Sequence, residues 1–496
     1  MRRTLFCFAI LLSAFSAAAK PDPAAERIDR FIRHTMAQFP EVPSLGVAIL
    51  RDGHPLLIRG YGFRDVEQKR AADADTAFYI ASSTKSYVGL LTAILAARGV
   101  VDLDAPITKY LTELRFGAGI DPQRVTLRTL LTHTAGLEND AITMRTAFSG
   151  EYTSAGLIDL LGRSKSIEPK FEYDNLGYVA AALVLERVTG KKWQDLLATE
   201  VFTPLRMNHT SAYMSRASAW PLAAAYDLDR DLHMHRMTFV KTDVTMHAAG
   251  GLVTTPRDLA RWLEVNVNAG RMGRRQVLPA SAFAEAQKKQ VVVSPETNWY
   301  RFKRYGYALG WYHSDYEGAL LLHHFGGYEG WRTHVSFLPK EKHGVAIATN
   351  TSGPAAQLRD VIAAFAYDVL LGKPDVETAY ETHLAKARAD LNQGLERYRA
   401  ELEKRKQRSP SLLRAQSSYA GAYASDAYGT ITVRDEGGSL SASLGPLHGL
   451  LEPFTEPDTA RVELIPGSGD VLRFVFEDAE RASAMKFRDE VFRRVE

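Results

Sequence analysis

From residue 43 to residue 64, Val, Ile and Leu alternate with polar residues on either side of Asp52-Gly53. Alternation is the period of a strand with one buried face, and Asp-Gly suits the two central positions of a type I′ turn. The pattern predicts a β-hairpin. Three later runs, at residues 319–324, 331–338 and 344–349, are short, apolar and separated by turn residues, so they predict further strands.

Three longer apolar runs lie between these strands, at residues 82–98, 176–189 and 256–268. The first is almost wholly apolar after its first turn and is followed by Gly99, which is typical of a buried helix with a glycine C-cap. Asn175 stands where the second helix would begin, and Gly190 stands where it would end. The predicted helices lie in the middle of the sequence, and the strands at its two ends would form one sheet. This arrangement predicts an α/β (α+β) fold.

The pattern changes after Pro374. Residues 376–408 are rich in Ala, Leu, Glu, Lys and Arg and place opposite charges four residues apart, as a solvent-exposed helix does. Short alternating runs between Gly, Pro and Asp turns then continue to the end of the sequence and predict a small antiparallel β-barrel-like domain. The predicted units are a main domain at 20–372, a charged linker helix at 373–408 and a β domain at 409–496.

The N-terminal residues have the pattern of an export signal. Arg2 and Arg3 precede an apolar run at residues 5–15 and then Ala17-Ala18-Ala19, so we expect cleavage after residue 19. The apolar run is shorter than the roughly 20 residues that cross a bilayer, and no later stretch is long enough. We therefore expect an exported protein with no stable membrane span, located in the periplasm or outside the cell, with the periplasm favoured.

Composition and charge exclude several classes of function. The 496 residues are 46% hydrophobic, as in globular proteins, and 61 Lys and Arg against 58 Asp and Glu give a net charge of +3. Because no basic cluster is present, we expect no nucleic-acid partner. Cys7 is the only cysteine and lies in the export signal, which excludes thiol catalysis, zinc–thiolate sites and disulfides in the mature chain.

Metal and cofactor chemistry is not indicated. His233 and His235 alternate, but without a third ligand such a pair is more typical of an exposed strand face than of a metal site. The sequence contains neither the H-E-x-x-H pattern of metalloproteases nor the G-x-S-x-G pattern of α/β-hydrolases. We expect no metal and no cofactor.

Ser82 and Lys85 stand three residues apart at the start of the first predicted helix, so both side chains would lie on one face and touch. A serine needs a neighbouring base to act as a nucleophile, and burial can lower the pKa of an amine enough for that task. The N–H groups at a helix start can also stabilise an oxyanion. The same spacing recurs at Ser483 and Lys486, but there it lies in a predicted strand.

Two further motifs add polar groups beside predicted elements. Tyr173 and Asn175 directly precede the second helix, and His324 and Gly326 lie at the end of an apolar strand that continues into Gly327. A phenol can relay protons, and glycine lets a strand backbone approach a substrate closely. Taken singly, the tyrosine could be a packing residue, the asparagine an N-cap and the histidine a buried core residue.

In this order, S-x-x-K, Y-x-N and H-x-G resemble the motifs of the serine β-lactamase and penicillin-binding-protein superfamily, particularly the class C β-lactamase-like serine hydrolases. The resemblance extends over roughly residues 40–365. Its further phrases are Gly60-Tyr61-Gly62, the LLTHTAGL run at 130–137, residues 202–207, Ala249-Gly250-Gly251-Leu252 and residues 324–331. It implies a mixed sheet flanked by helices, an all-helical lobe, and an active site between them.

The resemblance also implies a role for each motif residue. Ser82 would be the acylated nucleophile, Lys85 its proton acceptor or charge partner, and Tyr173 the general base that later activates water. Asn175 would hold Lys85 and a substrate amide, and His324 and Gly326 would contribute to substrate binding. The backbone N–H groups of Ser82 and Gly327 would form the oxyanion hole.

The third motif departs from the β-lactamase pattern. His324 stands where β-lactamases and D,D-carboxypeptidases have lysine, and Phe325 where they have Thr or Ser. Without a permanent cation and a hydroxyl, recognition of a substrate carboxylate should be weaker. The H-x-G version resembles D-aminopeptidases and esterases of the superfamily, so we expect hydrolysis of amides or esters in a small molecule or short peptide, with slow or no β-lactam turnover.

Other readings stay open at this point. One is a true class C-type β-lactamase or D,D-carboxypeptidase, and another is a catalytically silent sensor or binding module that keeps the fold. The C-terminal domain resembles the lipocalin-like β domains appended to several of these hydrolases, and it could be a passive module, gate the active site or mediate assembly into a homo-oligomer.

Overall fold

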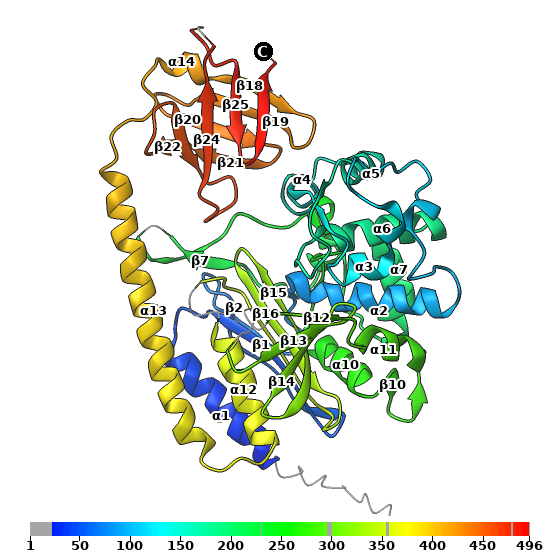
Figure 1. The fold of residues 1–496 in the computed structure, drawn as a ribbon. Helices are drawn as coiled ribbons and strands as arrows, with labels where there is room; N and C mark the ends of the chain where they lie inside the picture. Colours follow the sequence, from blue (N-terminus) through cyan, green and yellow to red (C-terminus); the bar gives the residue numbers. More distant parts are fainter. Residues whose placement is uncertain (1–21, 230, 295–299, 354–356, 478–479, 496) are drawn as a thin grey trace, which may run out of the picture.

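The computed structural model describes residues 22–229, 231–294, 300–353, 357–477 and 480–495. A sheet with helices on both faces lies beside a helical lobe, and a long helix leads to a C-terminal β domain (Figure 1). The predicted export signal, residues 1–19, lies outside the described residues. Within the described ranges, no helix combines the length and the apolar character needed to cross a bilayer.

The main sheet runs in the order β12-β13-β14-β15-β16-β17-β1-β2-β3. β1 pairs antiparallel with β2 on one side and with β17 on the other, so the sheet is indeed built from both ends of the domain. The turn between β1 and β2 has positive φ at Asp52 and Gly53, as predicted. The strands are β1 Ser44–Arg51, β2 His54–Asp65, β3 Arg70–Ala71, β12 Val291–Val292, β13 Lys303–Tyr307, β14 Tyr312–Tyr316, β15 Ala319–Tyr328, β16 Trp331–Leu338 and β17 His343–Thr349.

Alternation along β1 explains the layers on the two faces of the sheet. Val47 and Ile49 join the apolar core beneath α1 (Pro23–Gln38), α12 (Leu358–Leu370) and α13 (Val376–Lys406). Ala48 and Leu50 face the other way, into the core beneath α2 (Thr84–Ala97), α10 (Pro256–Val267) and α11 (Ala280–Gln287). Side chains at successive strand positions point to opposite faces, so β1 contributes to both cores.

The helical lobe continues the second of these cores. Its helices surround α6 (Leu176–Thr189), which ends at Gly190 with φ 69°, the glycine C-cap that the sequence predicted. The other helices are η2 Ile107–Lys109, η3 Pro122–Arg124, α3 Leu127–Leu131, α4 Asp140–Met144, η4 Arg145–Ser149, α5 Ser154–Gly162, α7 Trp193–Leu197, η5 Ala198–Phe202, α8 Thr203–Leu205, α9 Met214–Ala217 and η6 Asp243–Thr245. Short strand pairs outside the two large sheets are β4 Phe78–Tyr79 with β9 Val253–Thr254, β5 Leu137–Glu138 with β6 Lys165–Ser166, β7 Tyr226–Leu228 with β8 Met234–Arg236, and β10 Arg271–Met272 with β11 Arg275–Gln276.

The charged helix α13 differs from the expected solvent-exposed linker. Tyr380, Leu384 and Leu391 are buried and belong to the core shared with α1 and α12. Their spacing of four and seven residues forms a single stripe along the helix, which opposite-charge pairs on the other faces had obscured in the sequence. The helix therefore packs on the main domain for much of its length before it reaches the C-terminal domain (Figure 1).

The C-terminal domain is one antiparallel sheet in the order β21-β20-β19-β18-β26-β25-β24-β23-β22, preceded by α14 (Gln416–Tyr419). It is nearly closed, because a Cβ placed on Gly449 of β21 would lie 2.9 Å from the Glu463 carbonyl oxygen just beyond β23. Tyr419 and Tyr423 are fully buried in its core. The strands are β18 Gly421–Ser425, β19 Gly429–Asp435, β20 Leu440–Leu444, β21 Leu447–Leu450, β22 Glu452–Pro453, β23 Thr459–Val462, β24 Asp470–Val475, β25 Ala484–Phe487 and β26 Glu490–Arg494.

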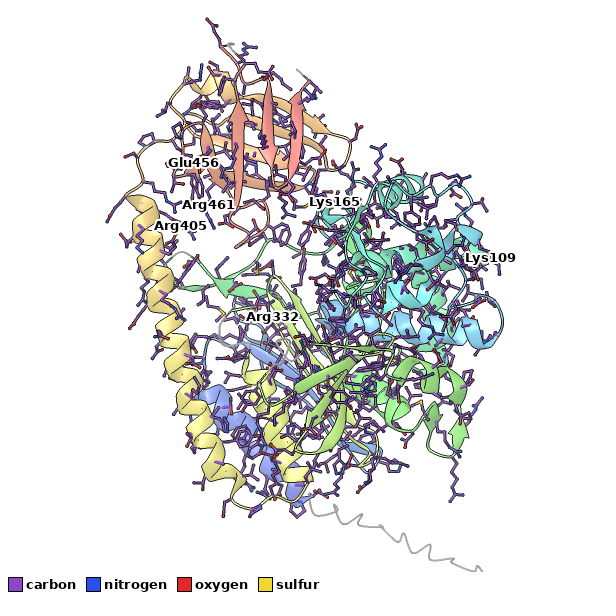
Figure 2. The ribbon with its side chains drawn as sticks, in the orientation of Figure 1. Lys109, Lys165, Arg332, Arg405, Glu456 and Arg461 are labelled. Carbon is purple, nitrogen blue, oxygen red and sulfur yellow. The ribbon has the colours of Figure 1, made fainter. Side chains whose placement is uncertain are left out.

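This domain is docked on the main domain at two places. Ala141 and Met144 of α4 belong to its apolar core, and Arg145 Nε donates to the carbonyl oxygen of Ala427 at 2.6 Å. At the other contact, Figure 2 shows Arg405 near the end of α13 beside Arg461, and both approach the Glu463 carboxylate. The β domain thus rests on the helical lobe as well as on the long helix.

Candidate active site

Ser82 and Lys85 lie at the junction between a 3-10 turn and α2. The predicted helix at 82–98 divides into η1 (Ala81–Ser83) and α2, so Ser82 stands on the turn that leads into the α-helix. Lys85 is fully buried, and its Nζ lies 3.3 Å from the Ser82 Oγ. The contact predicted from the spacing is present.

Two oxygen atoms complete the surroundings of the Lys85 amine. Nζ donates to Asn175 Oδ1 at 2.8 Å and to the Ala249 carbonyl oxygen at 2.9 Å. Burial lowers the pKa of Lys85 to about 7, although the Asp174 carboxylate acts in the opposite direction. A neutral amine has two protons, and both oxygens can accept one, which leaves its lone pair for the Ser82 hydroxyl.

The Y-x-N motif approaches the serine from the start of α6. The Asn175 side chain makes no cap hydrogen bond; Asp174 Oδ1 instead accepts from Gly177 N at 2.8 Å. This division leaves Asn175 free to hold Lys85, whose Nζ also lies 4.8 Å from the centre of the Tyr173 ring.

Tyr173 is 38% exposed, but its hydroxyl contacts the Ser82 hydroxyl. Burial raises its pKa well above the usual range, and Tyr312 adds to the increase, whereas contact with the Ser82 hydroxyl acts in the opposite direction. The phenol is therefore protonated in the resting state. This favours Lys85 as the first proton acceptor, with Tyr173 as the group that passes a proton onward.

The H-x-G motif lies on β15, against the turn that carries Ser82. A Cβ added to Gly326 would come within 2.0 Å of the Ile80 carbonyl oxygen, so only glycine permits this approach. Ser83 Oγ donates to the His324 carbonyl oxygen at 3.3 Å and ties the turn to the strand. Gly327, the next residue of β15, is exposed.

His324 is 1% exposed, and both of its ring nitrogens have hydrogen-bond partners. Nε2 lies 3.1 Å from the Tyr307 hydroxyl, and Nδ1 lies 2.8 Å from the Phe325 carbonyl oxygen. Burial lowers the pKa of His324 well below its usual value, and the nearby Lys85 acts in the same direction. The position that carries a lysine in β-lactamases therefore holds a neutral ring with no N–H available to a substrate carboxylate.

Three groups at this site were not singled out as catalytic from the sequence. The Ala249 carbonyl reaches Lys85 from a phrase whose glycines were the only signal: a Cβ on Gly251 would lie 2.5 Å from His247 N. His133 belongs to the LLTHTAGL run, but that run does not predict which residues His133 contacts. Tyr307, at the end of β13, lies in no motif at all.

The structure separates the remaining candidates from this site. Ser483 and Lys486 lie in and beside β25 of the C-terminal domain, as their context predicted. His233 and His235 are exposed in and beside β8. Within the described ranges, no group of three His, Cys, Asp or Glu side chains is arranged to hold a metal ion.

Comparison with known proteins gives a consistent assignment. Protein flp of Staphylococcus aureus (strain N315) is 24% identical over 330 residues, which cover 66% of this chain and 63% of flp; the match thus spans less than two thirds of that relative. The octameric penicillin-binding protein homologue from Pyrococcus abyssi has a TM-score of 0.60 at 21% identity and covers 94% of this chain and 99% of its own.

A D-stereospecific amidohydrolase from Streptomyces sp. is 25% identical with a TM-score of 0.53, covering 67% of this chain and 95% of its own. The family model described as Beta-lactamase matches residues 29–367. That match takes in the sheet, the helical lobe and every motif residue of the site. The chain therefore belongs to the Beta-lactamase family.

Proposed function

We propose that the protein is an exported serine hydrolase that cleaves amide or ester bonds through an acyl-enzyme on Ser82. The observation that carries the proposal is the Lys85 amine, fully buried, 3.3 Å from Ser82 Oγ and with a pKa lowered to about 7. An amine in this state can accept the serine proton near neutral pH.

The reaction follows from these contacts. The Ser82 proton moves to Lys85 while Oγ bonds to the substrate carbonyl carbon, and the backbone N–H groups of Ser82 and Gly327 would stabilise the resulting oxyanion. The bond to the leaving amine or alkoxide then breaks, and that group takes a proton relayed through Tyr173. Water attacks the acyl-enzyme, loses a proton along the same route and releases the acid and free Ser82.

The surroundings of Tyr173 favour a substrate with a free amine. A cavity of about 460 Å³ adjoins this residue, and its lining contains one basic side chain, Lys170. Lys170 Nζ lies 2.8 Å from the Glu168 carboxylate, so its charge is already paired. The acidic members of the lining are Glu138, Asp140, Glu168, Glu172 and Asp174. Such a cavity attracts a cation such as the ammonium group of an aminoacyl amide or peptide.

The third motif supports the same substrate class. Penicillins and peptides that end in D-Ala-D-Ala present a carboxylate, and the neutral, fully hydrogen-bonded His324 gives it no counter-charge. We therefore propose a peptidase or amidase for D-amino-acid-containing substrates, with esters as alternative acyl donors. The likeness to a D-stereospecific amidohydrolase is in keeping with this choice.

Export is the part of the proposal that rests on sequence alone, on the run from Arg2 to Ala19. N-terminal sequencing of the protein recovered from the periplasm of a bacterial host tests it. A mature chain that begins at Lys20 is expected; a chain that retains residues 1–19 in the cytoplasm would overturn it.

The nucleophile is tested by intact mass after exposure to a fluorophosphonate probe. We expect one adduct on the wild type and none on Ser82→Ala. Ser483→Ala is the matched control, because it removes the serine of the second S-x-x-K sequence, and it should label fully. Absence of an adduct on the wild type would favour the silent binding module instead.

The substrate class is tested by comparing D-phenylalanine p-nitroanilide, its N-acetyl derivative and a chromogenic cephalosporin. We expect the free amine to raise kcat/KM at least tenfold over the acetylated compound, a difference of about 1.4 kcal/mol. Glu138→Gln should reduce that preference and leave the acetylated substrate unaffected. Cephalosporin turnover equal to that of the aminoacyl substrate would support the β-lactamase reading.

A further inference from the structure

His133 holds the chain on both sides of Tyr173. The Glu172 N–H donates to the His133 carbonyl oxygen at 2.9 Å, and the Asp174 N–H donates to His133 Nδ1 at 3.2 Å. The two rings also pack together, with their centres 4.6 Å apart. The backbone N–H groups of the residues on either side of Tyr173 therefore both donate to one buried residue.

The backbone of His133 is itself unusual. Its φ is 58°, in the left-handed region that non-glycine residues seldom adopt, and the residue is 2% exposed. Strain of this kind persists where the surroundings fix the residue, and it concentrates at functional sites. Here the conformation belongs to a residue whose carbonyl group and ring both bind the segment that carries Tyr173.

The direction of each hydrogen bond can be followed from His133 to His324. Because the Asp174 N–H must donate, His133 Nδ1 accepts, and the proton of the neutral ring is on Nε2. Nε2–H then donates to the Tyr307 hydroxyl oxygen at 3.3 Å. That hydroxyl donates to His324 Nε2 at 3.1 Å, which leaves the His324 proton on Nδ1 to donate to the Phe325 carbonyl oxygen.

The donor and acceptor roles along this chain of hydrogen bonds agree with the groups at its two ends. The first partner is a backbone N–H and the last is a backbone carbonyl, so neither can reverse its role. Burial lowers the pKa of both histidines, in keeping with neutral rings. Tyr307, the central member, is fully buried. These hydrogen bonds from His133 through Tyr307 to His324, which we call the relay, connect the segment of the Y-x-N motif to the strand of the H-x-G motif.

We propose that His133 is a positioning residue that sets the place of Tyr173, and that Tyr307 couples this placement to β15 through His324. The inference rests on the proposed function, since it assumes that Tyr173 transfers the proton. β15 carries Gly327, so the relay holds the proton-transfer group and the oxyanion-binding strand in one fixed relation. A displacement of about 1 Å between such groups can cost 100-fold in rate.

The test uses His133→Ala, His133→Asn and Tyr307→Phe in the full-length protein, with p-nitrophenyl acetate and D-phenylalanine p-nitroanilide as substrates. His133→Ala removes the ring contacts, and we expect kcat to fall about 100-fold with KM nearly unchanged. Asparagine tolerates positive φ and offers Oδ1 to the Asp174 N–H, so His133→Asn should recover most of the loss, to within about tenfold of the wild type.

A double-mutant cycle tests the relay. His133→Asn and Tyr307→Phe break the same hydrogen bond, and Tyr307→Phe also removes the bond to His324. The double variant should therefore lose no more activity than the more impaired single variant. The control is Tyr367→Phe, which removes a buried hydroxyl that lies 2.7 Å from Ser336 Oγ outside the site, and it should keep the wild-type kcat.

Each result separates the inference from the function it rests on. A wild type that fails to label with fluorophosphonate overturns the proposed function and the inference together. A labelled, active wild type with an equally active His133→Ala overturns the inference alone. If His133→Ala does not fold, losses in His133→Asn and Tyr307→Phe that multiply in the double variant overturn the relay, and losses that do not multiply support it.

Discussion

At the scale of single residues, the state of Lys85 decides the chemistry. Its buried amine has hydrogen-bond contacts with Ser82 Oγ, Asn175 Oδ1 and the Ala249 carbonyl oxygen. None of these three groups is a carboxylate. Desolvation disfavours the cation, and the Asp174 carboxylate returns only part of that cost. The lysine is therefore both a structural donor and a base that is available near neutral pH.

This state predicts a pH dependence. Because Lys85 accepts the proton only when neutral, and its pKa is about 7, kcat/KM should rise with pH up to that value and level off above it. Asp174→Asn removes the charge that raises this pKa, so the midpoint should move to lower pH. Asp159→Asn, an exposed acid on α5, should leave the midpoint unchanged. A profile that is flat from pH 5 to about 9 would contradict the role of Lys85 as the base.

At the scale of elements, the site depends on how closely β15 approaches the turn η1. The Ile80 carbonyl fills the space where any side chain on Gly326 would lie, and Ser83 bonds to the strand one turn later. This packing sets the distance between the nucleophile and the strand that receives the substrate. Glycine is required here for close approach, since Gly326 has no positive φ.

Gly326→Ala should therefore separate η1 from β15. A Cβ 2.0 Å from a carbonyl oxygen forces a backbone shift, and we expect kcat to fall about 100-fold or more. The matched control is Gly394→Ala on α13, where no heavy atom lies within 4 Å of the new Cβ. That change should keep activity and stabilise the helix by about 0.5–1 kcal/mol. Thermal denaturation and aryl ester hydrolysis measure both effects, and an active Gly326→Ala would contradict this account.

At the scale of the whole molecule, the C-terminal domain is joined to the rim of the active site. The cavity at this junction, about 450 Å³, is lined by Glu138, Asn139 and Asp140, which also line the cavity beside Tyr173. Arg145 anchors the contact with two bonds, to the carbonyl oxygens of Ala427 at 2.6 Å and Asp426 at 3.0 Å. Figure 2 shows Lys165 and Arg332 on the parts of the main domain below this domain.

Loss of the Arg145 anchor should loosen the C-terminal domain. Arg145→Ala leaves two carbonyl groups without their charged donor, so we expect docking to weaken by about 1–3 kcal/mol. Arg163→Ala is the control, since its pair with Asp426 is 3.7 Å long and mostly exposed and should contribute little. The rate of limited proteolysis at residues 407–415 measures this loosening, and it should rise in Arg145→Ala. Equal cleavage rates in the two variants would contradict the anchoring role of Arg145.

The sequence by itself determined most of what depends on short-range periodicity. Alternation gave the β1–β2 hairpin and the central strands, and the three-residue spacing of Ser82 and Lys85 gave their contact, because neighbours within one element follow from its geometry. The motifs also indicated the family. The buried stripe of α13 was missed, since its apolar positions are sparse among charged residues.

Only the tertiary structure decided how distant segments meet. The Ala249 carbonyl comes to Lys85 from 164 residues away, and Tyr307 links His133 to His324 without belonging to any motif. Such contacts depend on how whole layers pack, which no local pattern encodes. The same packing excludes water from the Lys85 amine and the His324 ring. Spacing therefore identified the chemical groups, whereas burial set their protonation and so their chemistry.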